Sequence, residues 1–168
     1  PRRGLDWRGR RGARATAVPA TTTKPKSLGG IVLCMSYTID REFEGEFDVI
    51  VAEVEEALAE EGFGVLCDID VQATLKKKLG EEFRQYRILG ACNPPLAHQA
   101  LGEELQLGAL LPCNVVVYET DDGTVGVSAV DPSTMLSVVD NPDLDPIAAE
   151  VGERFVHVLD AVAAEVAA

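Results

Sequence analysis

The sequence predicts an α+β domain in which helices pack against a mixed β-sheet, in the order β-α-β-α-β-α-β-β-α. Several segments alternate apolar and polar residues, as half-buried strands do. Segments between them carry apolar residues at helical spacing. Asp122-Gly123 is a two-residue hairpin signal that joins the last two strands. Because helices connect the other strands, both parallel and antiparallel neighbours are expected.

The first half of the patterned region alternates strands and helices. Residues 36–43 alternate as a strand, and residues 47–61 place Ile50, Val54 and Leu58 on one helical face. Gly62 ends this helix. The following segments are a strand over 63–71 with Cys67 as a core residue, a short helix over 73–79 and a third strand over 82–89.

The second half begins with a helix predicted from Pro94 to residue 111, where Pro112 prevents its continuation. Residues 113–120 and 124–130 form the two strands of the hairpin. Asp145 is the expected N-cap of the last helix, with Pro146 at its first position. Residues 147–166 then show the clearest apolar stripe in the chain.

Charge divides the chain into two parts. Residues 1–34 contain eight basic residues and one acidic residue, whereas residues 35–168 contain seven basic and 27 acidic residues, a net charge of −20. This excess of carboxylate argues against binding to nucleic acid or to an anionic membrane surface. We interpret it as adaptation to a high-salt cytoplasm, such as that of a halophilic archaeon. The alternative is an acidic mesophilic protein.

The two parts also differ in organisation. Residues 1–34 are rich in Arg, Gly, Thr, Ala and Pro and lack a periodic pattern, so we expect a disordered leader, added for expression or translated from upstream sequence. Residues 35–168 form the single expected domain. The chain has no run of 18 apolar residues and no CxxC pair among its four cysteines. These features favour a soluble cytoplasmic protein.

Three motifs together resemble a known family. Residues 86–95 (YRILGACNPP), 110–117 (LLPCNVVV) and 127–132 (VSAVDP), in this order, are similar to the DUF302 family, and residues 74–80 (TLKKKLG) agree with it. The resemblance covers residues 35–165. It implies the small α+β fold called TT1751-like and a homodimer. It implies no reaction, because the family is named for its unknown function.

The motif GACNPPLAH (residues 90–98) is the main candidate site. Asn93 is expected to cap a helix, which would place Cys92 beside the positive end of the helix dipole and lower the pKa of its thiol. Cys113 begins a second Cys-Asn pair, and two neighbouring thiols would suit Cu(I), Zn or redox chemistry. The alternative is that both cysteines are structural. His98 and His157 are assigned to surface or packing roles.

Further candidates lie at strand ends and on the lysine-rich helix. Asn114 follows Cys113, and Asp131 ends a strand, where it would hold a metal, orient a ligand or stabilise a turn. Lys77 is central in the Lys76–Lys78 run, which together with Arg84 and Arg87 would attract an anion. The alternative is a solvated helix face.

Three functional hypotheses therefore remain open. The first is a dimeric domain that binds or senses a small ligand between Asn93, Asn114 and the strand ends. The second is a thiol-dependent redox or soft-metal protein that uses Cys92 and Cys113. The third is a structural or interaction module, for which no pocket larger than a few waters is expected at the motif. Whether the chain is an enzyme, and which cofactor it would use, stays open.

Overall fold

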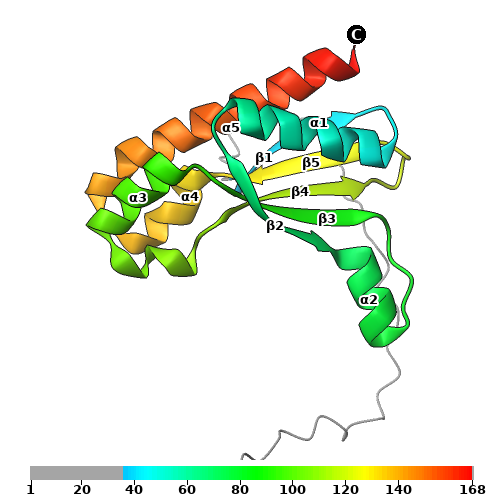
Figure 1. The fold of residues 1–168 in the computed structure, drawn as a ribbon, viewed down its shortest axis with the longest axis horizontal. Helices are drawn as coiled ribbons and strands as arrows, with labels where there is room; N and C mark the ends of the chain where they lie inside the picture. The colour runs from blue at the N-terminus through cyan, green and yellow to red at the C-terminus, as the bar shows by residue number, and fades with distance from the viewer. Residues whose placement is uncertain (1–35, 168) are drawn as a thin grey trace, which may run out of the picture. The chain divides into compact units, whose positions relative to one another are not determined.

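The computed structural model describes residues 36–167, so the predicted leader lies outside the described residues. This part of the chain has the α+β class and the succession of strands and long helices that the sequence predicts (Figure 1). Its elements are β1 (Thr38–Phe43), α1 (Phe47–Glu60), β2 (Gly64–Asp70), α2 (Val71–Leu79), β3 (Tyr86–Cys92), α3 (Pro94–Glu103), η1 (Leu105–Ala109), β4 (Cys113–Glu119), β5 (Val125–Val130), α4 (Pro132–Leu136), η2 (Ser137–Val139), η3 (Pro142–Leu144) and α5 (Asp145–Val166).

The strands form one sheet in the order β1-β5-β4-β3-β2, and every neighbouring pair is antiparallel. The expected mixture of parallel and antiparallel neighbours is therefore wrong. Strands β1 and β2, which α1 connects, run in the same direction but form opposite edges of the sheet. Because β3, β4 and β5 fill the space between them, the βαβ pattern in the sequence produces no parallel pair.

One face of the sheet is covered by α1 and α5, which lie side by side above it in Figure 1. Alternate strand residues point toward these helices, among them Val115, Val117 and Val127, and all three are buried. Phe155 of α5 is fully buried and stacks on Phe63 with ring centroids 4.9 Å apart. The main core is therefore a single layer between helices and sheet.

Within residues 36–167 no helix lies over the opposite face of the sheet, and α2 projects from the β2–β3 end (Figure 1). Asp70 caps α2 by accepting a hydrogen bond from the Ala73 N–H at 2.7 Å, and Gly80 ends it with a φ of 74°. Cys67 is exposed on β2, so its predicted place in the core is wrong. The reason is that β2 is an edge strand with a register irregularity between Val65 and Cys67.

Several boundaries differ from the predictions. The helix expected over 94–111 ends at Glu103 and continues as the 3₁₀ turn η1. Helix α4, which has no predicted counterpart, follows β5 directly, because Asp131 caps it and Pro132 occupies its first turn. Helix α5 begins at Asp145, whose side chain makes no capping bond, so the expected N-cap is one residue too late.

Candidate functional site

The GACNPPLAH motif joins the end of β3 to the start of α3. The side chain of Asn93 is buried and accepts a hydrogen bond from the Leu96 N–H at 3.3 Å, so it caps α3 as predicted. Its amide also donates to the Glu61 carbonyl at 3.4 Å, at the end of α1. Asn93 thus stabilises both the helix start and the packing of this connection against α1.

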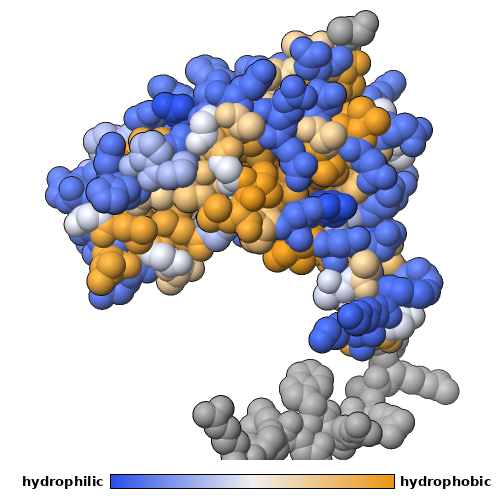
Figure 2. Space-filling view, viewed as in Figure 1, coloured by the Kyte–Doolittle hydropathy of each residue, from blue (hydrophilic) through white to orange (hydrophobic). Residues whose placement is uncertain are grey.

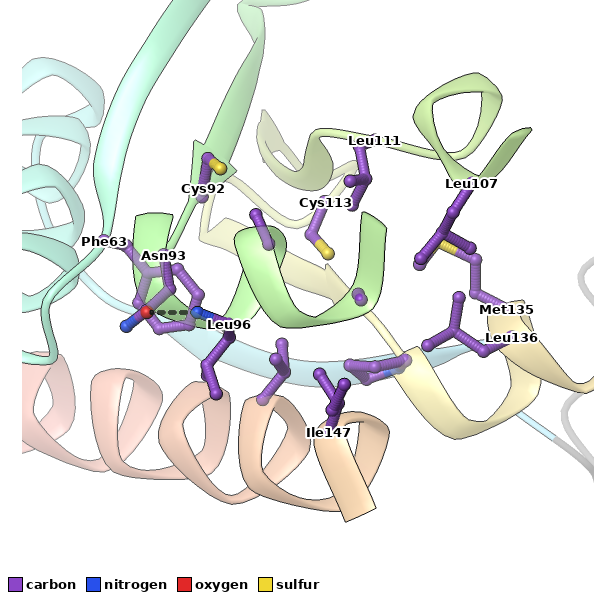
Figure 3. Close-up of a pocket in the computed structure, with 15 residues that line it drawn as sticks. Phe63, Cys92, Asn93, Leu96, Leu107, Leu111, Cys113, Met135, Leu136 and Ile147 are labelled. Carbon is purple, nitrogen blue, oxygen red and sulfur yellow. Dashed lines mark hydrogen bonds between the residues drawn. The ribbon is translucent and has the colours of Figure 1, made fainter. Parts of the chain in front are cut away.

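Cys92 and Cys113 line the same cavity, which lies between the sheet and helices α3, α4 and α5 (Figure 3). Cys113 pairs across the sheet with Ala91, and Cys92 is the next residue along β3. The cavity measures about 40 Å³ and its walls are almost entirely apolar, with Leu96, Leu107 and Met135 among them. This volume is sufficient for a few water molecules and not for an organic ligand.

Burial determines the protonation state of the Cys92 and Cys113 thiols. It raises the pKa of Cys92, and it raises the pKa of Cys113 from 9.0 to about 11, with a smaller contribution from neighbouring Cys92. The predicted lowering by the helix dipole is therefore wrong, because desolvation of the thiolate is the larger effect. At neutral pH both groups are protonated and poorly nucleophilic.

The histidines do not join the cysteines. His98 is exposed on α3, and His157 is exposed on α5 with Nδ1 3.7 Å from Glu61 Oε1. No group of three or more His, Cys, Asp and Glu side chains in residues 36–167 is arranged to hold a metal ion. A metal at the cysteines would therefore depend on the two thiols and on sulfur or backbone donors.

A much larger hollow, of about 560 Å³, lies on the uncovered face of the sheet. Strands β1, β3, β4 and β5 form its floor, and Leu110, Pro112 and Met135 lie at its border. Figure 2 shows hydrophobic residues along the lower side of the body, between the α3–α4 end and the projecting α2. The polar residues that line the hollow are Thr38, Asp40, Asn114 and Ser128. Three tyrosines, Tyr37, Tyr86 and Tyr118, line it as well.

Two of these tyrosines are held by the strand register. Tyr86 and Tyr118 are directly opposite each other on β3 and β4, and their rings are nearly parallel, with centroids 5.8 Å apart. Gly126 makes room for the Tyr118 ring, because a Cβ at this position would lie 2.5 Å from Tyr118 Cζ. Burial raises the pKa of Tyr86, with smaller contributions from Tyr118 and Tyr37. All three tyrosines line the same hollow.

Comparison with known proteins gives the family. The family model described as "Domain of unknown function DUF302" matches residues 39–162. The chain belongs to the DUF302 family. A crystal structure of an uncharacterized conserved DUF302 protein from Bacillus stearothermophilus superposes on this DUF302 chain with a TM-score of 0.71 and 32% sequence identity, covering 75% of this chain and 98% of the other. The comparison with curated proteins finds no match.

The DUF302 fold separates the two asparagines that the sequence predicted to share a pocket. Asn93 lines the small cavity, whereas Asn114 lines the hollow on the other face. The cause is the alternation of side chains along β4, which turns Cys113 toward the helices and Asn114 away from them. No helix in the described part of the chain has the length and apolar character required to cross a bilayer.

The remaining predicted residues lie outside both cavities. Asp131 accepts hydrogen bonds from the Ser133 and Thr134 N–H groups, at 2.9 and 3.3 Å, and so caps α4. Lys77 is exposed on α2. The cations expected to join it are paired with carboxylates: Lys76 with Glu82, Arg84 with Asp121 and Arg87 with Asp68. These pairs neutralise most of the positive charge that would attract an anion.

Sequence reasoning missed the tyrosines and Asp40 as site residues. A usable signal was present, because all three tyrosines of the chain fall in or beside predicted strands. Alternation along β4 also places Asn114, Val116 and Tyr118 on one face. The strand order, which brings β1 and β3 to the same hollow, could not be read from that alternation.

Proposed function

We propose that this DUF302 domain is a cytoplasmic homodimer that binds a small ligand in the hollow on the uncovered sheet face. The observation that carries the proposal is the volume and lining of the hollow. About 560 Å³ is within the range of small-molecule sites, and the walls combine apolar surface with a few polar groups. The cavity at the GACNPPLAH motif is too small for this purpose, which favours a structural role for the motif.

Rigidity also supports binding at the hollow. The floor consists of regular paired strands, and Tyr118 is held between Tyr86 and Gly126. Side chains on such a scaffold are already ordered, so a ligand pays little conformational entropy when it binds them. An exposed loop would offer no such advantage.

The ligand proposal can be tested by NMR with a fragment library on the full chain. Amide shifts of Asn114, Tyr118 and Ser128 are expected to move with saturable dependence on fragment concentration. Amides around Leu96, beside the small cavity, serve as the internal control and are expected to stay in place. Shifts confined to the Leu96 region would contradict the location, and no shifts with any fragment at millimolar concentration would contradict ligand binding.

The proposed homodimer rests on the arm formed by β2 and α2. None of the nine residues of α2 is buried, and a helix this short is marginal in water without a packing partner. Leu66 and Leu79 are each 67% exposed, and Ile69 and Phe83 are also exposed. A second copy would cover these side chains. It would also bring Lys77 and its neighbours toward a body with strong negative charge, which is favourable.

Light scattering coupled to size exclusion tests this dimer, in low and in molar salt so that self-repulsion is screened. Leu79→Asp is expected to give a monomer, because it adds a charge to the proposed apolar contact. Val138→Asp is the matched control, since Val138 is 74% exposed away from the arm, and it should leave the dimer intact. A wild-type monomer in both salts would contradict the proposal, as would equal effects of the two variants.

A second candidate function is soft-metal binding or redox chemistry at Cys92 and Cys113. The observation that favours it is that both cysteines line the same cavity. Metal binding would displace two protons from thiols whose pKa is raised, so affinity should increase with pH. Titration with Cu(I) under a competing chelator is expected to give one equivalent bound, lost in both Cys92→Ser and Cys113→Ser. Unchanged binding in Cys113→Ser would contradict this site.

A further inference from the structure

The lining of the hollow carries information about the charge of its ligand. Of the twelve residues that line it, Asp40 is the only charged one, and none is basic. Thr38 Oγ1 donates a hydrogen bond to Asp40 Oδ2 at 3.1 Å. Within residues 36–167 no basic side chain forms an ion pair with Asp40. An anionic ligand would therefore meet a carboxylate in a lining that contains no basic residue.

The net charge of the protein around the hollow also disfavours an anionic ligand. The patterned part of the chain has a net charge of −20. A cleft within such a body concentrates cations and repels anions. The lysines of α2 and the arginines paired to carboxylates do not line the hollow. The net charge of the domain and the charge of the lining therefore both favour a cationic ligand over an anionic one.

The tyrosines supply the second element of recognition. The Tyr118 ring lies against Gly126 of β5, and Tyr118 lines the hollow. Tyr86 lies beside it, nearly parallel, and Tyr37 lines the same hollow from the residue before β1. The negative face of an aromatic ring attracts cations, and groups of aromatic rings are a recurring site for quaternary ammonium ligands.

We propose that the hollow binds a small organic cation, an alkylated or quaternary ammonium group, over the rings of Tyr86 and Tyr118 with Asp40 as the counter-charge. This inference rests on the proposed ligand-binding function and specifies its ligand class. Asn114 and Ser128, which also line the hollow, would accept or donate hydrogen bonds to a hydroxyl or carbonyl of the same ligand. No covalent step is involved.

The test compares choline with 3,3-dimethylbutan-1-ol, a neutral molecule of nearly the same shape, by NMR titration of the full chain. Choline is expected to bind about 5- to 30-fold more tightly, since a cation–π contact is worth about one to two kcal/mol. Acetate, a small anion, is expected to cause no saturable shifts in the hollow.

Variants assign the effect to the named residues. Tyr118→Leu removes the ring face and is expected to weaken choline binding about tenfold, whereas Tyr118→Phe keeps the ring and should stay within about twofold of wild type. Asp40→Asn should weaken choline without changing the binding of the neutral alcohol. Asp48→Asn, an exposed carboxylate in the first turn of α1, is the matched control and should have no effect.

The outcomes separate this inference from the proposed function. If the neutral alcohol binds as tightly as choline, or if acetate binds better, the ligand class is wrong while ligand binding in the hollow stands. If Tyr118→Leu and Asp40→Asn leave choline binding unchanged, the assigned residues are wrong. If no compound, cationic, neutral or anionic, shifts the amides of the hollow, both the ligand class and the proposed function fail.

Discussion

Replacing Gly126 with alanine tests whether the Tyr118 ring is held against β5. The new Cβ would lie 2.5 Å from Tyr118 Cζ, 2.8 Å from Cε2 and 2.9 Å from the hydroxyl oxygen. Carbon atoms in contact prefer about 3.5–4.0 Å, so the ring must move by about 1 Å or more. Overpacking of this kind costs about 1–3 kcal/mol. Alanine in a strand otherwise gains about 0.5–1 kcal/mol over glycine.

The expected net effect of Gly126→Ala is a loss of about 1–2 kcal/mol in the free energy of unfolding, which follows from these opposing contributions. In a Tyr118→Ala background the ring is absent, so the same substitution should instead stabilise by about 0.5–1 kcal/mol. The coupling energy between the two positions is therefore about 1–3 kcal/mol.

Urea unfolding followed by circular dichroism measures all four corners of this cycle, with m-values compared to confirm that the folded states are equally compact. Gly108→Ala is the matched control, because a Cβ there meets nothing within 4 Å. It should show no coupling to Tyr118→Ala. If Gly126→Ala has the same effect in both backgrounds, the ring does not lie where the structure places it, and the argument for a fixed aromatic floor is refuted.

Three further predictions concern the motif, the buried thiol and the acidic surface. Asn93→Ala should cost about 1–2 kcal/mol in thermal or urea unfolding through loss of the α3 cap, and Asn93→Ser, which keeps a neutral capping oxygen, should cost less; equal losses would count against the cap. Stability should fall by about 2 kcal/mol as pH rises from 9 to 11, because folded Cys113, with a pKa of about 11, keeps a proton that the unfolded chain has lost. Subtracting the pH profile of Cys113→Ala isolates this contribution, and identical profiles would contradict it. If the net charge of −20 in residues 35–168 reflects a high-salt cytoplasm, the urea midpoint should rise from low to molar KCl, whereas a midpoint insensitive to salt would favour the mesophilic alternative.

The elements that could be predicted from sequence are those with a strong local signal. Helix α1 and helix α5 carry apolar stripes, and the hairpin after β4 has Asp122-Gly123 at its turn, so their positions were confirmed to within a few residues. The short helix α4 was missed because only five residues separate its start from η2, too few for a periodic pattern. The burial of Cys67 was wrong because local pattern does not distinguish an edge strand from a central one.

By itself the sequence determined the α+β class, the capping role of Asn93, the family motifs and the acidic charge, since all of these depend on residues close together in the chain. Only the tertiary structure decided the strand order, which placed Asn93 and Asn114 on opposite faces and gathered Tyr37, Tyr86, Tyr118 and Asp40 around one hollow. It also decided that Cys92 and Cys113 line an apolar cavity, where burial raises the pKa of both thiols. The physical reason is that solvent exposure and long-range contact depend on which surfaces meet, and strand pairing determines which surfaces meet.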